Sequence, residues 1–223
     1  MSTLLAPGVT LVKRLAPDVL ILDVRRHFGT TPMRPSEWLA QANHVKREGA
    51  GPGSLTEDGL EYHVLTGDWV EAEDPGLYEA YLDLVPAVSQ ALGRKLVASE
   101  DVRSRLNINL LSGRGSTYEL HTDSQPYTGI LFVTEHALGG ELLITQPPRD
   151  PQQAPPLDGS YSGGAEWHVR PQPGLMVLFD GQRYPHAVLP LRADELRVTI
   201  PMVFVDPDAG EVRPEGTDEH LYA

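Results

Sequence analysis

The chain has 223 residues, of which 40% are hydrophobic and 7% aromatic, an ordinary composition for a globular domain with a sizeable core. It contains no cysteine, which excludes disulfides, thiolate-bound metals and cysteine nucleophiles, and it has no apolar run long enough to span a membrane. The formal net charge of -13 disfavours nucleic acids and anionic membranes as partners, because such a surface repels phosphate groups. Because cysteine and a secretory signal are both lacking, we expect a cytoplasmic protein.

The first hundred residues combine two patterns. Short apolar runs predict strands, whereas apolar residues at three- and four-residue steps predict helices. The predicted elements are strands at residues 9–12 and 19–24 and helices at residues 35–46 and 76–97. Pro86 lies inside the second helix and predicts a kink or a division into two helices. We interpret residues 1–104 as a helical or mixed buttress of a sheet, not as a separate domain.

From residue 105 onward, glycine and proline interrupt the sequence at short intervals, and runs rich in β-branched and apolar residues lie between them. Eight strands are predicted, at residues 105–111, 117–121, 128–134, 141–145, 166–170, 175–179, 186–191 and 196–205. Eight short strands in one block predict a sandwich or a jelly roll. We therefore expect one domain over residues 1–223, mainly β with flanking helices, with a core at 105–205 and a C-terminal tail at 206–223.

Two polar stretches predict long loops. Residues 46–57 are rich in glycine and predict a mobile loop, and residues 147–164 are rich in proline, glutamine, aspartate and glycine. Long loops inside a compact domain often act as lids over a site, so the second stretch is either a lid or a surface insertion.

The sequence His121-Thr122-Asp123 lies at the end of the second of the eight strands. Residues two apart on a strand point to the same side, so an imidazole nitrogen and a carboxylate oxygen can converge on one metal ion. This pair alone is weak evidence in a chain with eight histidines. His186 begins the seventh strand, where a lone histidine is more often structural. Together, however, the three residues form the two-histidine, one-carboxylate set that binds iron(II) from one side and leaves the opposite positions open.

Arg197 lies in the last predicted strand among apolar neighbours. Burying a guanidinium there is unfavourable without an anionic partner, and its planar fork fits a carboxylate. Thr199, two residues further on, points to the same side and can add a hydroxyl donor. The alternative is an arginine on an edge strand that faces water.

The order of these residues resembles the iron(II)- and 2-oxoglutarate-dependent oxygenases, whose fold is a double-stranded β-helix, a cupin-like jelly roll with flanking helices. The segments that carry the resemblance are Asn109-Leu-Leu-Ser-Gly113, Tyr118-Glu-Leu-His-Thr-Asp123, Thr128-Gly-Ile-Leu-Phe132, Gly139-Gly-Glu-Leu142, residues 169–179 and Arg197-Val-Thr199. They cover roughly residues 105–205 and are specific as a set. The first hundred residues have no part in the resemblance.

The resemblance implies site residues and cofactors. His121, Asp123 and His186 would be the iron ligands at the catalytic centre, and Arg197 with Thr199 would bind the distal carboxylate of 2-oxoglutarate. The implied cofactors are iron(II), 2-oxoglutarate and oxygen, with ascorbate as an optional reductant.

Three further positions bear on the cosubstrate pocket. Phe132 stands where many members of the family place an aromatic wall of this pocket. Many members also have a tyrosine where this chain has Leu111, and we expect Asn109 or another group to supply the missing polar contact. Tyr118 either lines the pocket or packs in the core.

The activity implied by the resemblance is hydroxylation of an unactivated C–H bond, with release of succinate and carbon dioxide. Asp123 favours this reaction over halogenation, and desaturation or ring closure are alternatives. We expect a small-molecule substrate, such as an amino acid or a natural-product intermediate. The alternatives are a prolyl or other side-chain hydroxylase acting on proteins, and a cupin-like metal protein or 2-oxoglutarate-independent dioxygenase, which would not need Arg197. The sequence sets no oligomeric state.

Overall fold

The computed structural model describes residues 2–47, 60–135, 138–146, 165–209 and 222. Each of the eight strands predicted after residue 105 is present, with bounds that differ from the expectation by a few residues. They are β7 (Ile108–Ser112), β8 (Tyr118–His121), β9 (Tyr127–Phe132), β10 (Leu142–Thr145), β11 (Glu166–Val169), β12 (Leu175–Asp180), β13 (His186–Val188) and β14 (Leu196–Val205). The predicted loop at 147–164, most of the loop at 46–57 and most of the predicted tail lie outside the described residues.

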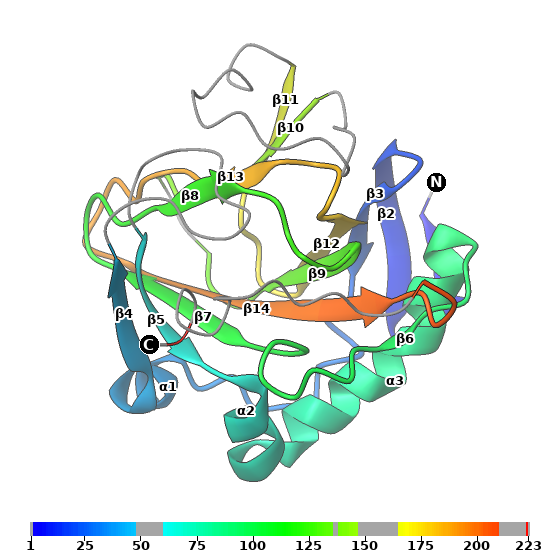
Figure 1. Cartoon of the computed structure of the whole chain (residues 1–223), viewed down its shortest axis with the longest axis horizontal. Helices are drawn as coiled ribbons and strands as arrows, with labels where there is room; N and C mark the ends of the chain where they lie inside the picture. The colour runs from blue at the N-terminus through cyan, green and yellow to red at the C-terminus, as the bar shows by residue number, and fades with distance from the viewer. Residues whose placement is uncertain (1, 48–59, 136–137, 147–164, 210–221, 223) are drawn as a thin grey trace.

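The eight strands form two antiparallel sheets that face each other (Figure 1). The small sheet has the order β11-β10-β13-β8, and the large sheet contains the neighbours β12-β9-β14-β7. The chain therefore passes from the large sheet to the small one and back, as in a double-stranded β-helix. This confirms the predicted jelly-roll core.

The N-terminal residues contribute more strand than the sequence predicts. Three strands, β1 (Thr3–Ala6), β2 (Val9–Ala16) and β3 (Val19–Asp23), extend the large sheet beyond β12. Two more, β4 (Asn43–Arg47) and β5 (Leu60–Leu65), extend it beyond β7. The two strands predicted at 9–12 and 19–24 are thus confirmed, and the further strands β1, β4 and β5 accompany the helices in this half of the chain.

The helix predicted at residues 35–46 is half wrong. Helix α1 (Pro35–Gln41) ends early, and the residues that follow it form β4, which pairs with β5 so that His44 lies opposite His63. Val45 is fully buried by this pairing. The strand partner supplied by the fold overrides the local helical pattern, because strand preference depends on packing against neighbours more than on local sequence.

The long helix α3 (Pro75–Leu92) follows the short α2 (Gly67–Glu73) and remains a single helix despite Pro86. Pro86 has no backbone N–H, so the carbonyl of Leu82 lacks its usual hydrogen-bond partner in the helix. Both residues lie on the exposed side of the helix, where water can hydrate this carbonyl. The helix ends at Gly93, which adopts φ 66° as a left-handed cap. Among the described residues, no helix combines the length and the apolarity that a membrane crossing needs.

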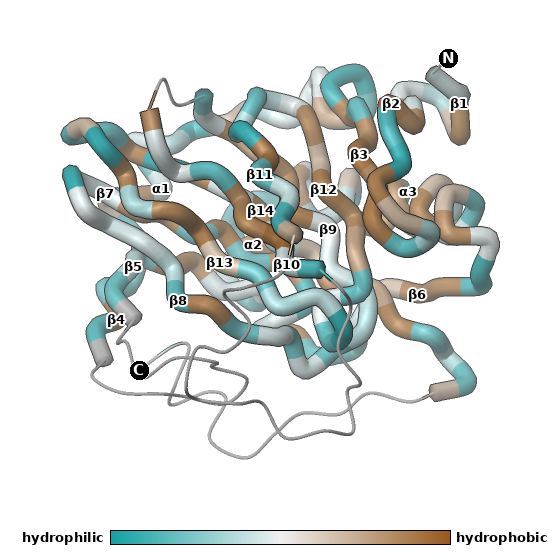
Figure 2. Tube along the Cα trace, turned by 90° about the horizontal axis from the view of Figure 1, so that it is seen from above, coloured by the Kyte–Doolittle hydropathy of each residue, from teal (hydrophilic) through white to brown (hydrophobic). Residues whose placement is uncertain are grey.

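Helix α3 packs on the face of the large sheet that points away from the small sheet (Figure 1). Its buried side chains include Leu77, Leu84 and Val88, which belong to one apolar core with alternate residues of the sheet. Figure 2 shows the resulting concentration of hydrophobic residues along the central strands, with hydrophilic residues in the connections. The other face of the sheet is thereby left free to line the space between the two sheets.

Tyr81 fixes the helix to the last strand. Its hydroxyl donates to the carbonyl of Val203 at 2.6 Å and accepts from the backbone N–H of Ser99 at 3.1 Å. The side chain is fully buried, so these hydrogen bonds are shielded from water.

Replacing Tyr81 with phenylalanine removes both hydrogen bonds and keeps the ring. We expect Tyr81→Phe to lower the free energy of unfolding by about 1–2 kcal/mol, measured by urea denaturation. Tyr78→Phe on the same helix is the control, because the Tyr78 hydroxyl makes no hydrogen bond with the described residues. Equal losses in the two variants would contradict this assignment.

Candidate active site

A cavity of about 250 Å³ lies between the two sheets. Its lining follows from strand alternation, since neighbouring residues of a strand point to opposite faces. On β14, Val198, Ile200 and Met202 point into the core with the helices, whereas Arg197 and Thr199 line the cavity. One face of this strand therefore packs in the hydrophobic core, and the other face lines the cavity.

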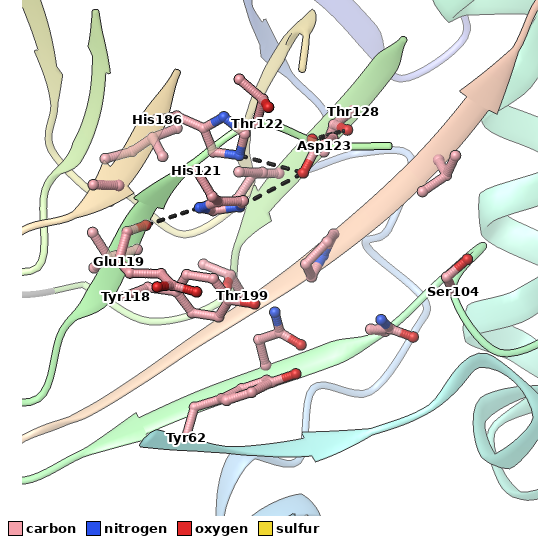
Figure 3. Close-up of a pocket in the computed structure, with 18 of the residues that line it drawn as sticks. Tyr62, Ser104, Tyr118, Glu119, His121, Thr122, Asp123, Thr128, His186 and Thr199 are labelled. Atoms are coloured by element: carbon pink, nitrogen blue, oxygen red, sulfur yellow. Dashed lines mark hydrogen bonds and ion pairs between the residues drawn. The ribbon is translucent and has the colours of Figure 1, made fainter. Parts of the chain in front are cut away.

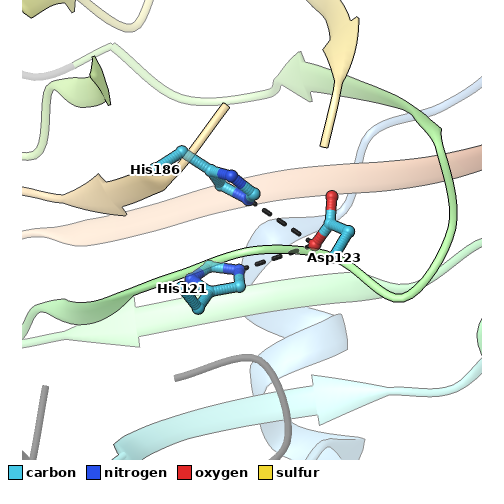
Figure 4. Close-up of side chains that lie close together, drawn as sticks. All are labelled: His121, Asp123 and His186. Atoms are coloured by element: carbon cyan, nitrogen blue, oxygen red, sulfur yellow. Dashed lines mark ion pairs between the residues drawn. The ribbon is translucent and has the colours of Figure 1, made fainter. Parts of the chain in front are cut away.

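The proposed metal ligands come together on the small sheet. Strand β13 pairs with β8 so that His186 lies directly opposite His121, with ring centroids 4.2 Å apart. Asp123 follows two residues after His121, and its Oδ1 lies 3.6 Å from Nε2 of His121 and 3.5 Å from Nε2 of His186 (Figure 4). One potential ligand atom from each residue lies within 4.8 Å of the others, which suits a single metal ion.

Hydrogen bonds orient all three ligands. Nδ1 of His121 donates to the carbonyl of Glu119 at 2.8 Å, and Nδ1 of His186 donates to the carbonyl of Tyr184 at 3.0 Å. Because each Nδ1 carries the proton, each Nε2 is left with a lone pair directed at the common point. Thr128 donates its hydroxyl to Oδ2 of Asp123 at 2.5 Å, which leaves Oδ1 toward the histidines.

The turn between β12 and β13 holds Asp123 in place. The N–H of Asp123 donates to the carbonyl of Gly181 at 2.9 Å, and the N–H of Gly181 donates to the carbonyl of Pro126 at 2.7 Å. Any side chain at Gly181 would collide with the ligand, because a Cβ there would lie 2.1 Å from Oδ2 of Asp123. Glycine at this position is therefore part of the site.

Burial and neighbouring groups act in opposite directions on the ionisation of Asp123 and His121. Burial by itself raises the pKa of the Asp123 carboxyl, but the two imidazoles beside it outweigh burial and hold the pKa well below its usual range. Burial by itself lowers the pKa of His121, but its hydrogen bond and charge interaction with Asp123 outweigh burial and raise it. The carboxylate is thus ionised and ready to bind a cation.

Arg197 lies in the same cavity and is 3% exposed. Its Nε donates to the carbonyl of Gly140 at 2.9 Å, and its Nη1 donates to the Thr199 hydroxyl at 3.3 Å. Nη2 is buried and has no hydrogen-bond partner among the described residues. Burial lowers the pKa of Arg197 to about 9. A buried cation with an unused donor fits the carboxylate of 2-oxoglutarate in charge and geometry.

The remaining predicted residues take different places. Asn109 lines the cavity next to Thr199, its register partner on β14, and Leu111 lines it opposite Arg197. Phe132 is fully buried and does not line the cavity; the guanidinium carbon of Arg197 lies 5.9 Å from the centre of its ring. Phe132 therefore contacts the Arg197 guanidinium from the core, in a cation–π arrangement.

Tyr118 lines the cavity because of a β-bulge. It lies three residues before His121, and a regular strand would turn the two side chains to opposite faces. The register between β8 and β13 shifts here, so that Val188 pairs with Tyr118 while His186 pairs with His121. The extra residue re-aims Tyr118 toward the site. The sequence shows no signal for this bulge.

Sequence reasoning missed several other residues of the site. Thr128 and Gly181 were not expected, although an Asp-Gly pair at 180–181 indicates a turn. The cavity extends from the metal ligands to Tyr62 and Ser104, which Figure 3 shows on the far side from His186. Tyr222 also lines it. These residues are distant in sequence, so only the fold brings them together.

No protein-family model and no curated protein sequence matches the chain significantly. Solved structures do resemble it. The carbocyclase SnoK, described as non-haem and α-ketoglutarate-dependent, from nogalamycin biosynthesis, aligns with a TM-score of 0.60 at 16% identity over 96% of this chain and 85% of that one. The epimerase SnoN, in complex with Fe³⁺, α-ketoglutarate and nogalamycin RO, aligns with a TM-score of 0.59 at 16% identity over 85% and 80%. A prolyl hydroxylase of Trichoplax adhaerens with a hypoxia-inducible-factor peptide aligns with a TM-score of 0.56 at 14% identity over 86% of each chain.

These likenesses show the fold. The chain has the double-stranded β-helix that occurs in iron- and 2-oxoglutarate-dependent oxygenases, as the sequence resemblance implies. Its own residues then show that a two-histidine, one-carboxylate cluster and a buried arginine share the cavity of that fold.

The hydrogen bond from Thr128 to Asp123 gives a test of the cluster that leaves the ligands intact. We expect Thr128→Val to weaken metal binding about 10- to 100-fold, because it removes the donor that orients the carboxylate. Isothermal titration of the metal-free protein with zinc or cobalt(II) measures this. The exposed Thr3→Val on β1 is the control, and unchanged affinity in the Thr128 variant would contradict the role given to its hydroxyl.

Proposed function

We propose that this chain is an iron(II)- and 2-oxoglutarate-dependent dioxygenase that hydroxylates an unactivated C–H bond of a small molecule. One observation carries the proposal: the ligand cluster and the unpartnered guanidinium nitrogen of Arg197 open into the same cavity. Either feature alone would suit proteins of several classes. A metal-binding carboxylate cluster beside a buried cation suits a cosubstrate that must bind the metal at one end and present a carboxylate at the other.

The residues have separate roles in this proposal. His121, Asp123 and His186 would hold iron(II) from one side, and Arg197 with Thr199 would bind the distal carboxylate of 2-oxoglutarate. When bound, iron and 2-oxoglutarate would supply, together with O2, the oxidising chemistry of hydroxylation, in which one oxygen atom of O2 enters the C–H bond and the other enters succinate as carbon dioxide is released. The apolar cavity wall, which includes Leu111, excludes water around the reacting atoms.

A small molecule is the proposed substrate class, namely an amino acid or a natural-product intermediate. A cavity of about 250 Å³ lies just below the usual range of about 300–1,000 Å³ for small-molecule sites, so it favours a small substrate. The titles of SnoN and SnoK name a natural product or its biosynthesis, whereas the Trichoplax hydroxylase was solved with a peptide. Desaturation, ring closure and epimerisation use the same kind of site and remain alternatives to hydroxylation.

A cupin-like metal protein without 2-oxoglutarate is the competing function. Arg197 argues against it, because burial of a cation without an anionic ligand would be unfavourable and would serve no metal site. Retained metal binding without succinate formation would favour this alternative.

The proposal is tested by succinate formation from 2-oxoglutarate with iron(II). Arg197→Met keeps most of the side-chain volume and removes the charge, so we expect 2-oxoglutarate affinity to fall by about 100-fold or more while metal affinity is retained. Mass spectrometry of succinate and titration of 2-oxoglutarate measure the two effects. The exposed Arg26→Met is the control. Wild-type protein that neither binds nor turns over 2-oxoglutarate would overturn the proposal.

A further inference from the structure

The cavity has a second end that the cosubstrate does not reach. Its floor consists of β7 and β14, paired so that Leu111 lies opposite Arg197 and Asn109 opposite Thr199. Asn107 continues the same side of β7, and its N–H donates to the carbonyl of Pro201 at 3.0 Å. Four residues of extended chain separate Asn107 from Leu111, roughly 13 Å. This exceeds the length of an extended five-carbon dicarboxylate, so this end is available to the primary substrate.

The side chain of Asn107 presents an unused acceptor there. The residue is 8% exposed, and its amide Nδ2 donates to the Tyr222 hydroxyl at 2.9 Å. The Tyr222 ring is itself held by Arg103, whose guanidinium carbon lies 4.8 Å from the ring centre. With Nδ2 engaged, the carbonyl Oδ1 is the atom left over, and this buried oxygen has no hydrogen-bond partner among the described residues. Buried acceptors are normally hydrogen-bonded, so a donor group of a bound ligand would pair with this oxygen.

The charges around this end favour a donor-bearing ligand and disfavour an anion. Asp101 brings a carboxylate to the lining at this end, where it accepts a hydrogen bond from the Ser104 hydroxyl at 2.6 Å. Among the lining residues that the structure describes, Arg197 is the one permanent cation, and it lies at the cosubstrate end. A substrate carboxylate or phosphate would therefore find no counter-ion among the described lining residues at this end, since the Arg103 guanidinium stacks on the Tyr222 ring and is not part of the lining.

We propose that the Asn107 end of the cavity binds N–H or O–H groups of the primary substrate, which is a neutral or cationic molecule bearing hydroxyl or amino groups. A substrate anchored by a carboxylate or a phosphate does not fit. The proposal rests on the proposed function for what happens to this molecule, but its binding chemistry is a property of the cavity itself. It narrows the substrate class proposed above to polyols, amino alcohols and related natural-product intermediates, and it removes free acids, including free amino acids, from that class.

Three ring compounds of similar size separate the possibilities: trans-2-aminocyclohexanol, trans-cyclohexane-1,2-diol and cyclohexanecarboxylate. Binding to the full chain loaded with zinc and 2-oxoglutarate is measured by ligand-observed NMR, since zinc supports no turnover. We expect the amino alcohol or the diol to bind at least about tenfold more tightly than the carboxylate. Tighter binding of the amino alcohol identifies a cationic substrate, and equal binding of the two identifies a neutral one. Binding of the carboxylate as tight as or tighter than both, or of none of the three, would overturn the proposal.

Variants of Asn107 locate the binding. Asn107→Leu removes the acceptor at similar volume and should weaken binding of the preferred compound about tenfold or more. Asn107→Asp keeps an acceptor and should retain binding, or tighten it for the amino alcohol. The exposed Asn43→Leu is the matched control, and thermal melting verifies folding. Equal binding in wild type and the Leu variant, or loss in the Asp variant with its fold intact, would contradict the role of Oδ1.

The same protein samples separate this inference from the proposed function. Succinate formation without a primary substrate, and its loss in Arg197→Met, report on the cosubstrate end alone. If the ring compounds bind as expected but 2-oxoglutarate does not turn over, the proposed function fails and the binding site stands. If turnover occurs but Asn107 variants leave binding unchanged, this inference fails and the proposed function stands.

Discussion

The register between β8 and β13 is the constraint on which the site depends. It sets His186 opposite His121, and the side chains of a directly opposed pair are close enough to share one ligand. A slip of one residue would turn His186 to the other face of the small sheet and abolish the cluster. Burial on the inner face resists such a slip, because Val188 and Tyr118, the next pair along, would also be displaced from the interior. Apolar packing and metal-ligand geometry therefore reinforce the same pairing.

A turn and a strand outside this pair complete the cluster. The turn after β12 fixes Asp123 through backbone hydrogen bonds at Gly181, and Thr128 at the start of β9 fixes the carboxylate plane. Each of these contacts comes from the large sheet or its connections. The metal-ligand cluster is thus a link between the two sheets, and its geometry depends on their separation. Ligand orientation by surrounding hydrogen bonds of this kind is usual for metal centres.

The sequence predicts the fold where local patterns and tertiary pairing agree, and fails where they conflict. Alternation on β14 is visible in the sequence, because Val198 and Ile200 are apolar while Arg197 and Thr199 are polar. The strand at 43–47 is hidden, since its partner β5 lies well separated in sequence. The predicted metal-ligand set depends on the order of His121, Asp123, His186 and Arg197 along the chain, because the His121 and Asp123 pair alone is weak evidence. The bulge at Tyr118 could not be found, because nothing local distinguishes it from a regular strand.

Charge is distributed unevenly along the cavity. The same charged groups therefore affect both the stability of the folded protein and its binding of ligands. Arg197 is buried with a lowered pKa and an unused donor, while the cluster around Asp123 is anionic. Burial of the Arg197 cation is a local electrostatic cost to the protein alone, whereas the surroundings favour the ionised form of Asp123; a ligand of opposite charge would match each of them. His121, Asp123 and His186 would hold the metal cation, and Arg197 would bind a carboxylate of 2-oxoglutarate, so that both charges would be matched together. At the far end, the buried oxygen Oδ1 of Asn107 lacks a hydrogen-bond partner among the described residues, and a neutral donor can supply one. The floor formed by β7 and β14 therefore offers a cation at Arg197 and a hydrogen-bond acceptor at Asn107. This difference between its two ends directs the cosubstrate to the first and the primary substrate to the second.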